Sequence, residues 1–304
     1  MHSAPCPLPF DERDPVRSLP QDRELWFDGR FRTSLARAGL RTFRDVMATS
    51  AGRCLRILPD RENWYLWLGA PHAAPLGMYL KKHHVRTWKT RLRAWLGIGP
   101  ALSAGRAEAQ NIRDLSALGI GVPLLVAHGE ELRADGLLES FLLTEELVGY
   151  EELGTFVLQR FSRADAERRD PGLDRLIRQV ATIARRFHAA GYNHRDFYCC
   201  HFLVKEVRPG EFDIRLIDLQ RMERRQWFRR RWIVKDLAQL AYSAPDSVLR
   251  CREKLLFLRH YLGVGKLRPE HKRLVRAVVF KQRVMERKLG KAGGQPVADS
   301  RQTG

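Results

Sequence analysis

The chain has 304 residues, which is enough for one large domain or for two lobes around a cleft. Hydrophobic residues make up 44% of it, and 54 Lys and Arg against 35 Asp and Glu give a formal net charge of +19, a composition that excludes a disordered or collagen-like chain. No stretch approaches the roughly 18 apolar residues of a membrane-spanning helix, and no secretory signal opens the chain, so the sequence predicts a cytoplasmic protein.

The five cysteines form no CxxC pair and have no histidines at zinc-finger spacing, so we expect neither a disulfide framework nor a structural zinc site. The positive charge suits either nucleic-acid phosphates or the anionic face of a membrane. Composition does not distinguish these partners, and the motifs along the chain must do so.

The first half of the chain predicts a β-rich lobe over residues 23–147. Residues 1–22 are rich in proline and charge and suggest a poorly ordered tail, whereas the arginine-rich residues 23–49 are expected to be helical. A helix is also expected at 106–118, with Gly119 as its C-cap. Short β-forming segments predict an antiparallel sheet over 54–59, 63–69, 77–84, 122–129 and 140–147.

The second half predicts a helical lobe over residues 148–289. Helices are expected at 151–161 and 172–190, followed by strand-like pieces at 201–207 and 212–219 and by further helices to about residue 289. Residues 290–304 are small and polar and suggest a second tail. A β-rich lobe followed by an α-rich lobe predicts a bilobal α+β fold with ligands in the cleft between the lobes.

The segment NHRDFYCCHFLV, from Asn193 to Val204, carries the clearest chemical signal. It follows the long helix, contains His-Arg-Asp ending at Asp196 and leads into a strand, and the next strand ends at Asp218. This order of elements is that of the catalytic segment of the protein-kinase fold. Phosphoryl transfer from ATP needs one carboxylate to orient the attacking hydroxyl or accept its proton and a second to hold Mg²⁺, and the two aspartates suit those roles.

A cation on the small-lobe sheet is also required, because the ATP phosphates must be steadied. Lys81 lies on the expected third strand, and Glu108 follows at the distance of a helix residue that could pair with it. Strand alternation sends Lys81 and Lys82 to opposite faces, so only one of them can face the cleft. His83 and His84 are expected to be solvated at the end of this strand.

The motifs NHRDFYCCHFLV and LIDLQRM resemble the Kdo/WaaP family of lipopolysaccharide kinases, and the resemblance extends over about residues 76–245. It implies a protein-kinase-like fold and an ATP-dependent kinase, of the core heptose(I) kinase type, that phosphorylates a sugar hydroxyl (heptose or Kdo) of the lipopolysaccharide inner core. It implies Asp196 as the catalytic carboxylate, Asp218 as the Mg²⁺ ligand, Lys81 as the phosphate-binding lysine and Glu108 as its partner. Asp236 resembles the buried carboxylate that starts a large-lobe helix and binds the catalytic loop.

The resemblance also places the nucleotide. The hinge at 144–147, with Glu145 and Leu147, would meet adenine through its backbone, and His201 replaces the asparagine found after the catalytic aspartate in protein kinases. Because Mg²⁺ prefers oxygen ligands, His201 is expected to contact phosphate or to brace the loop. Asp218 is followed by Leu-Gln rather than Phe-Gly, and no Gly-x-Gly-x-x-Gly precedes the lysine strand, so the phosphate-covering loop is not placed.

Several basic segments have two interpretations. Arg221 and the arginines that follow it up to Arg231 form a solvated surface or face the acceptor. The amphipathic residues 87–99 pack on the small lobe, which we favour, or form an interfacial membrane helix, and residues 266–289 pose the same choice. We expect a lipopolysaccharide core or related phosphorylated glycolipid as partner, with an anionic membrane surface rather than nucleic acid, and a location in the cytoplasm or on the inner face of the inner membrane.

Other functions stay open at this point. The chain could be a protein Ser/Thr kinase or a small-molecule kinase of the aminoglycoside type, although the residues after Asp218 disfavour the first. It could also be an inactive kinase fold that binds nucleic acid or membrane, which the presence of Lys81 and Asp196 argues against. Cys199 and Cys200 are expected to fill the core rather than to act as nucleophiles.

Overall fold

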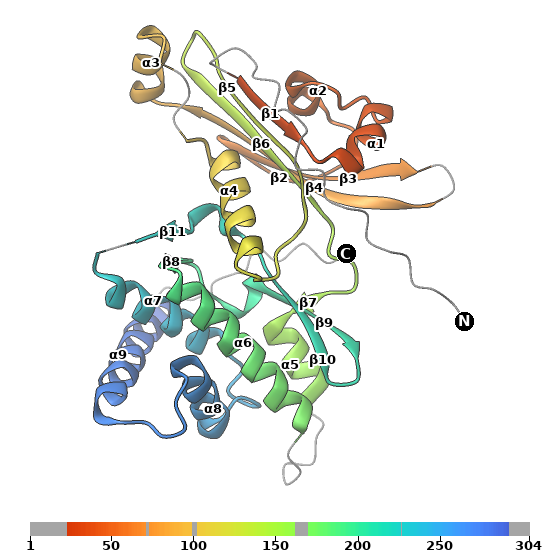
Figure 1. The fold of residues 1–304 in the computed structure, drawn as a ribbon. Coiled ribbons are helices and arrows are strands. Elements are labelled where there is room, and N and C mark those ends of the chain that lie inside the picture. Colours follow the sequence, from red (N-terminus) through yellow and green to blue (C-terminus); the bar gives the residue numbers. More distant parts are fainter. Residues whose placement is uncertain (1–22, 71–72, 99–101, 162–169, 226, 292–304) are drawn as a thin grey trace.

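The chain folds into a half built on a sheet and a mainly helical half (Figure 1). The computed structural model describes residues 23–70, 73–98, 102–161, 170–225 and 227–291. The predicted tail at 1–22 and residues 292–304 of the predicted C-terminal tail (290–304) lie outside these ranges. The last helix continues through Lys291, so the first two residues of that predicted tail are helical. Within the described ranges, no helix has the length and apolar character needed to cross a membrane.

A six-stranded antiparallel sheet, with the strand order β1, β5, β6, β4, β3, β2, forms the first half. Its strands are β1 (Arg23–Phe27), β2 (Arg53–Leu58), β3 (Arg61–Ala70), β4 (Ala73–Arg86), β5 (Leu125–Leu132) and β6 (Leu137–Glu145). The five predicted β segments are all strands, as their β-forming residues indicate. Lys81 on β4 pairs with Asn63 on β3 and with Leu142 on β6, so it lies in the middle of the sheet.

Strand alternation separates the two lysines of β4, as predicted. Lys82 is buried on the face opposite to Lys81, and its Nζ donates a hydrogen bond to the carbonyl of Thr49 at 2.6 Å. The prediction that His83 and His84 are solvated is wrong, because His83 is only 4% exposed and His84 is half-buried. β4 is a central strand with a neighbour on each side, which covers more of it than its charged sequence suggests.

Residues 23–49 are not helical throughout, contrary to the prediction. They form β1, which pairs with β5 at the edge of the sheet, and then η1 (Gly29–Phe31), α1 (Arg32–Arg37) and α2 (Phe43–Ala48). Leu35, Phe43 and Val46 from the two α-helices pack with Leu80 and Phe141 of the sheet. These helices therefore cover one face of the sheet and build the core of the first half.

α3 (Trp88–Trp95) follows β4 and begins at a capping box formed by Thr87 and Thr90. The sequence favoured packing of this amphipathic segment on the small lobe. That expectation is wrong for its two tryptophans, because Trp88 is 70% exposed and Trp95 is 81% exposed. The helix lies at the ends of the central strands β4 and β6, and its large apolar side chains are in solvent.

α4 (Ala104–Ala117) links the two halves. It begins at Ser103, whose side chain caps the first turn, and Gly105 allows a close approach to β6, because a Cβ there would come within 2.7 Å of the carbonyl oxygen of Phe141. Further along, Ile112 and Leu115 are buried in the hydrophobic core of the second half. α4 thus touches the sheet at its start and belongs to the helical half at its end.

The second half is mainly helical, as predicted, and confirms the bilobal α+β arrangement. Its helices are α5 (Leu153–Phe161), α6 (Pro171–Ala189), η2 (Cys199–His201), η3 (Leu219–Arg221), α7 (Arg229–Ser243), α8 (Cys251–Leu262) and α9 (Pro269–Lys291). Its strands form two small antiparallel sheets, one of β7 (Glu151–Glu152), β9 (Phe202–Arg208) and β10 (Glu211–Leu216), the other of β8 (Tyr192–Asn193) and β11 (Glu223–Arg224).

α6 is the central helix of this half. Asp170 caps its start, Pro171 occupies the first turn, and Val180, Ala184 and Phe187 are buried at helical spacing. The ring of Phe187 stacks on the ring of Phe197 with 5.7 Å between the centroids. Because Phe197 directly follows the His-Arg-Asp motif, this contact holds the motif on the core.

Candidate active site

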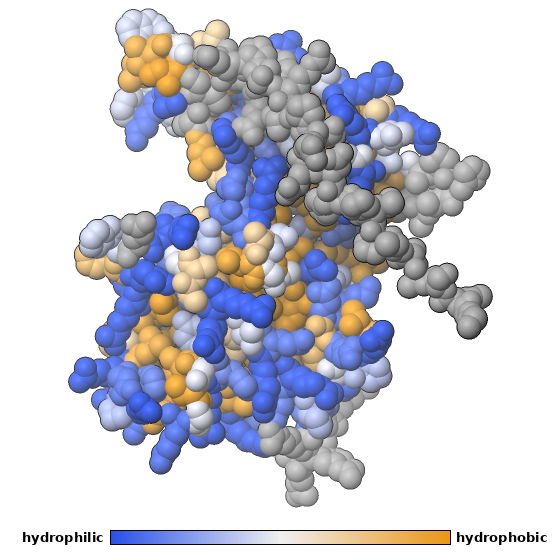
Figure 2. Space-filling view, in the orientation of Figure 1, coloured by the Kyte–Doolittle hydropathy of each residue, from blue (hydrophilic) through white to orange (hydrophobic). Residues whose placement is uncertain are grey.

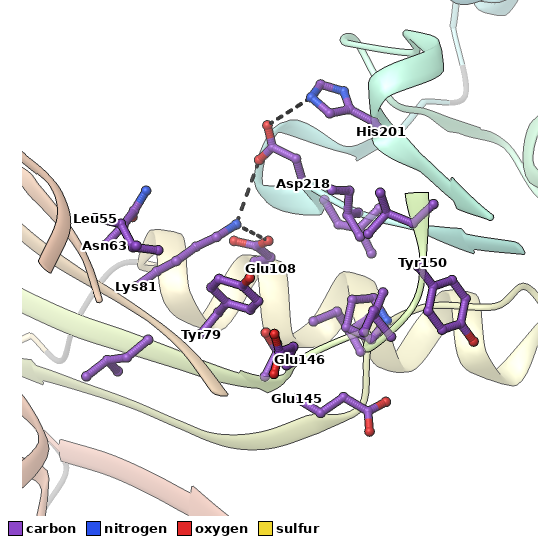
Figure 3. Close-up of a pocket in the computed structure, with 18 of the residues that line it drawn as sticks. Leu55, Asn63, Tyr79, Lys81, Glu108, Glu145, Glu146, Tyr150, His201 and Asp218 are labelled. Atoms are coloured by element: carbon purple, nitrogen blue, oxygen red, sulfur yellow. Dashed lines mark hydrogen bonds and ion pairs between the residues drawn. The ribbon is translucent and has the colours of Figure 1, made fainter. Parts of the chain in front are cut away.

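Lys81, Glu108 and Asp218 meet in a cleft between the two halves (Figure 3). The Nζ of Lys81 lies 2.8 Å from Oε1 of Glu108 and 3.9 Å from Oδ1 of Asp218. Burial lowers the pKa of Lys81, but the carboxylates of Glu108 and Asp218 outweigh this effect and raise the pKa above its ordinary value. Lys81 is therefore a charged ammonium group held in place by two carboxylates from other elements.

Asp218 lies in the turn after β10 and has a left-handed backbone with a φ of 56°. Its Oδ2 is 3.7 Å from Nε2 of His201. Burial raises the pKa of Asp218, but the positive charge of Lys81 and then the electrostatic effect of the nearby His201 lower it more, so the pKa falls below its ordinary value. A non-glycine residue keeps such a conformation only where its surroundings hold it, and here they hold a charged carboxylate toward the cleft.

The His-Arg-Asp loop is held by α7. Asp236 is fully buried, and its two carboxylate oxygens accept hydrogen bonds from the backbone N–H groups of His194 at 2.8 Å and Arg195 at 3.1 Å. Gln239, one turn further on, donates to the carbonyl of Arg195 at 2.9 Å and accepts from the N–H of Phe197 at 3.1 Å. Asp236 lies in the middle of α7 rather than at its start, which corrects the prediction, because the helix begins two turns earlier.

Asp196 is joined to this assembly through its backbone and its side chain. Nδ1 of His201 lies 2.6 Å from the carbonyl oxygen of Asp196, so His201 bridges Asp196 and Asp218. Nη1 of Arg221 donates a hydrogen bond to Oδ2 of Asp196 at 2.7 Å. The four residues that the sequence singled out for chemistry are thus connected through His201 and Lys81.

The cleft has a volume of about 540 Å³, within the range of small-molecule sites in proteins. The segment 144–147 lines it, as do Leu203 and Ile217 from the second half. Oε1 of Glu145 accepts a hydrogen bond from the N–H of Leu124 at 3.0 Å, and the N–H of Glu145 donates to the carbonyl of Leu124 at 3.1 Å. Neither this carboxylate oxygen nor this N–H is therefore offered to a nucleotide. Leu203 and Ile217 form an apolar wall opposite the backbone of residues 144–147, an arrangement that suits a flat heterocyclic base.

A basic hairpin stands where protein kinases have a glycine-rich loop. Arg56 on β2 and Arg61 on β3 both line the cleft. Arg61 is close enough to lower the pKa of both Lys81 and Asp218. Both strands of this hairpin were predicted, but the two arginines were not singled out as cleft residues. The signal that could have found them is their position on either side of the Pro-Asp turn between two predicted strands.

Other residues around the loop were missed as well. The Nζ of Lys235 donates a hydrogen bond to the carbonyl of Arg195, the same oxygen that Gln239 contacts. Arg221 was assigned to a solvated or acceptor-facing surface, and its ion pair with Asp196 was not foreseen. Lys235 and Gln239 lie one residue before and three residues after the buried Asp236, a helical spacing that could have indicated a shared face.

His194, Cys199 and Cys200 have neutral side chains at ordinary pH. Burial lowers the pKa of His194 to about 4, and its Nε2 lies 3.1 Å from the carbonyl of Ile217. Burial also raises the pKa of the Cys199 thiol to about 11 and that of Cys200 to about 12. Thiols in this state are poor nucleophiles. Cys199 is buried in the core, as predicted, whereas Cys200 is half-buried and lines the cleft, which corrects the prediction for this residue.

The donor set around Asp218 fits Mg²⁺ carried by a nucleotide better than a resident metal. Among the residues that the structure describes, no three His, Cys, Asp or Glu side chains are grouped so as to hold an ion. Mg²⁺ is commonly bound by one or two carboxylates together with phosphate oxygens and water. Asp218 provides such a carboxylate, with its side chain 40% exposed beside Lys81.

Comparisons with known proteins identify the family. The sequence pattern of the lipopolysaccharide kinase (Kdo/WaaP) family matches residues 64–261. Over 194 residues the chain is 40% identical to the lipopolysaccharide core heptose(I) kinase WaaP of Pseudomonas aeruginosa, a match that covers 61% of this chain and 69% of that protein. Over 219 residues it is 34% identical to WaaP of Escherichia coli K12, covering 69% of this chain and 80% of that protein.

A solved structure gives the same relationship. WaaP in complex with acyl carrier protein is similar to this fold with a TM-score of 0.62 and 32% sequence identity, covering 88% of this chain and 98% of that one. These findings confirm the predicted protein-kinase-like fold and the predicted class of enzyme, a kinase with an alcohol acceptor in lipopolysaccharide core biosynthesis. The chain belongs to the lipopolysaccharide kinase (Kdo/WaaP) family.

Proposed function

We propose that this protein transfers the γ-phosphoryl group of ATP to a hydroxyl of the first heptose in the lipopolysaccharide inner core. The observation that carries the proposal is the assembly of Lys81, Glu108 and Asp218 beside the loop of Asp196, in a member of the lipopolysaccharide kinase family. The names of the matched relatives, which are core heptose(I) kinases, favour heptose over Kdo as the acceptor.

The nucleotide is proposed to lie in the cleft with adenine against the backbone of Glu145 and Leu147. Lys81, held by Glu108, would bind the phosphates, and Asp218 would hold Mg²⁺ against them. Bound in this way, Mg²⁺ neutralises charge on the phosphates during transfer. His201 would keep Asp218 aligned with the catalytic loop, since it contacts the carboxylate of one residue and the backbone of the other.

Asp196 is proposed as the group that orients the attacking hydroxyl and accepts its proton. Arg221 occupies Oδ2 of this carboxylate, so Oδ1 is the oxygen that would meet the acceptor. The hydrogen bonds from α7 hold the backbone of the loop, and they limit the positions that the carboxylate can take. This arrangement supplies positioning, which is the main protein contribution to phosphoryl transfer.

The acceptor is proposed to be met in the cytoplasm, at the inner face of the inner membrane. Lipopolysaccharide cores carry phosphate and carboxylate groups, and a protein with a net charge of +19 attracts such a target over distances of a Debye length. The attraction raises the encounter rate and does not choose the hydroxyl, which must be selected within the site.

The test is transfer of γ-labelled phosphate from Mg-ATP to core lipopolysaccharide extracted from a strain that lacks the kinase. Asp196→Asn should lower transfer by about 10²–10⁴-fold while ATP binding is retained, because the proton acceptor is lost and the nucleotide site is intact. Asp218→Asn should lose both transfer and Mg²⁺-dependent ATP binding. Mapping the label to the first heptose completes the assignment.

Three results would contradict this assignment. Unchanged transfer in Asp196→Asn would remove the proposed catalytic carboxylate. Label that reaches peptides or aminoglycosides but not lipopolysaccharide would replace the acceptor. Absence of Mg²⁺-dependent ATP binding in the unmodified protein would indicate a kinase fold that serves as a binding module.

A further inference from the structure

Exposed aromatic side chains project from two places on one side of the molecule. On α3, Trp88, Leu92 and Trp95 lie at helical spacing and are 70%, 44% and 81% exposed. Just before α7, Trp227 and Phe228 are 80% and 85% exposed. We name these two places the α3 lip and the α7 lip. Both lie on the left in Figure 1, and Figure 2 shows a hollow between them.

The apolar stripe of the α3 lip faces away from the protein. A surface helix ordinarily turns such a stripe toward the core. In α3, all of whose side chains are described, Thr90 alone is buried, and it belongs to the capping box. On its inner side the helix lies against the β5–β6 turn, where a Cβ on Gly136 would come within 2.6 Å of Cα of Arg91. The backbone is thus anchored to the sheet while the tryptophans point outward.

The α7 lip combines an unfavourable backbone with an exposed ring. Phe228 has a φ of 54°, in the left-handed region that bulky residues rarely adopt. Conformations of this kind persist where other interactions compensate for them. The backbone is held within the chain, because Phe228 is the N-cap of α7 and its carbonyl accepts a hydrogen bond from the N–H of Arg231 at 3.1 Å. The ring itself is 85% exposed, so its apolar surface is open to an environment outside the chain.

Both lips pair aromatic rings with cations. Lys89, Arg91 and Arg93 lie on α3, whose sequence has no acidic residue, and three arginines at 229–231 open α7 with no acidic residue in its first turn. Tryptophan rings settle at the level of lipid headgroups, and lysine and arginine bind anionic headgroups. This combination fits the surface of an anionic bilayer better than an apolar groove on another protein, because such a groove offers no negative charge to the cations.

We propose that the α3 lip and the α7 lip dock the protein on a bilayer of anionic lipids, with the hollow between them facing the membrane. This deepens the proposed function and rests on it only for the identity of the acceptor. Arg221 precedes the α7 lip by one short strand, so a sugar attached to a lipid could approach the Asp196 loop while its acyl chains stay in the bilayer. The docking itself requires neither ATP nor acceptor.

The test measures binding of the full chain to vesicles, without ATP or lipopolysaccharide. Vesicles of phosphatidylcholine containing phosphatidylglycerol are compared with vesicles of phosphatidylcholine alone, by co-sedimentation. The pair Trp88→Ser with Trp95→Ser, and the pair Trp227→Ser with Phe228→Ser, should each lower the partition coefficient for the anionic vesicles about tenfold. The matched control is Trp67→Ser, a residue 54% exposed on β3, whose hairpin with β4 projects on the opposite side of the molecule.

Retained binding in Trp67→Ser, loss in both lip variants and weaker binding at high salt would support the proposal. The substituted side chains are exposed, so circular dichroism melting curves should match those of the unmodified protein. Binding that is equal for neutral and anionic vesicles, or that survives all four lip substitutions, would overturn it. So would unchanged vesicle binding in variants that lose binding to acyl carrier protein, since the lips would then be a protein interface.

Discussion

The carboxylate of Asp196 and the guanidinium of Arg221 form a pair that a motif search does not reveal. Their 2.7 Å hydrogen bond occupies one oxygen of the Asp196 carboxylate, the group proposed to be catalytic, and limits its rotation. We expect Arg221→Ala to lower kcat about 10- to 100-fold, because a freely rotating carboxylate is displaced from the acceptor. KM for ATP should not change, since the proposed nucleotide site is separate from this contact. Steady-state kinetics would measure both quantities.

The variant Arg221→Lys serves as the control for that measurement. A lysine keeps the charge but cannot form the same planar contact, so partial recovery of kcat is expected. A rise in KM for lipopolysaccharide with unchanged kcat would instead show that Arg221 binds the acceptor and does not position Asp196.

Arg61 offers a separate prediction for the nucleotide. It lines the cleft on β3 and lies near Lys81 and Asp218, where ATP phosphates are proposed to bind. We expect Arg61→Ala to raise KM for ATP about tenfold, the effect of losing one charge-assisted hydrogen bond. Arg53→Ala on the neighbouring strand, whose guanidinium lies over the ring of Tyr65, is the matched control and should leave KM unchanged. Equal effects of the two substitutions would indicate a general charge effect.

The functional residues that the sequence predicts are those that occur in motifs in a recognisable order along the chain. Lys81, Glu108, Asp196 and Asp218 are identified by the order in which they occur, and the structure brings all four to one place. Arg221 lies in one of those motifs, yet its ion pair depends on how a turn meets a loop 25 residues away in the chain. A one-dimensional pattern holds no information on such a contact.

α7 holds the His-Arg-Asp loop in place, a role that the weak amphipathic pattern of this helix does not indicate. Asp236 accepts two backbone hydrogen bonds from the His-Arg-Asp loop and lies 3.4 Å from Nε2 of His188. We expect Asp236→Ala to lower the free energy of unfolding by about 3–5 kcal/mol, because it leaves buried donors without partners. Urea denaturation would measure the change.

Asp246→Ala is the control for this element. Asp246 has a side chain that is 77% exposed and pairs with Lys254 at the surface, so its removal should change the free energy of unfolding by less than about 1 kcal/mol. A comparable loss in the two variants would mean that the hydrogen bonds to the loop are not what makes Asp236 important.

Long elements were predictable and short ones were not. α6 and the strands of the sheet carry enough residues to show their periodicity, whereas β7, β8 and β11 have two residues each and exist only through pairing. β1 was mistaken for helix because five residues, RELWF, do not outweigh the helical character of the arginine-rich residues that follow. Its identity as a strand depends on the edge that β5 offers, which is set elsewhere in the chain.

Three buried histidines make the free energy of unfolding of the whole protein depend on pH in the acidic range. Burial is the main cause that lowers the pKa of His83 to about 4, of His128 to about 3 and of His194 to about 4, with neighbouring positive charges as a further cause. Because these pKa values lie below that of an unfolded histidine, the unfolded state binds more protons as the pH falls below about 6.5. Stability should therefore be full above that pH and decline toward pH 4, by up to about 1.4 kcal/mol per pH unit for each histidine.

Urea denaturation at a series of pH values between neutrality and pH 4 would follow this decline. His128→Gln removes one titrating group and keeps an acceptor for Arg113, whose Nη2 lies 3.0 Å from the imidazole. The pH dependence of the variant should be shallower by about one proton. Identical slopes for variant and unmodified protein would show that this imidazole is protonated in the folded state.

The position of α4 determines whether the enzyme can be regulated by movement of the helix that carries Glu108. Nδ2 of Asn111 donates to the carbonyl of Leu219 at 2.8 Å, directly after Asp218, while Ile112 is buried in the core of the helical half. In regulated protein kinases the corresponding helix swings, and activity is gained when its glutamate returns to the lysine. In this protein such a movement of α4 would expose Ile112 and disrupt the hydrophobic core. Lys81 and Glu108 therefore stay paired in the absence of a ligand. The site would then bind nucleotide without a preceding activating movement of α4.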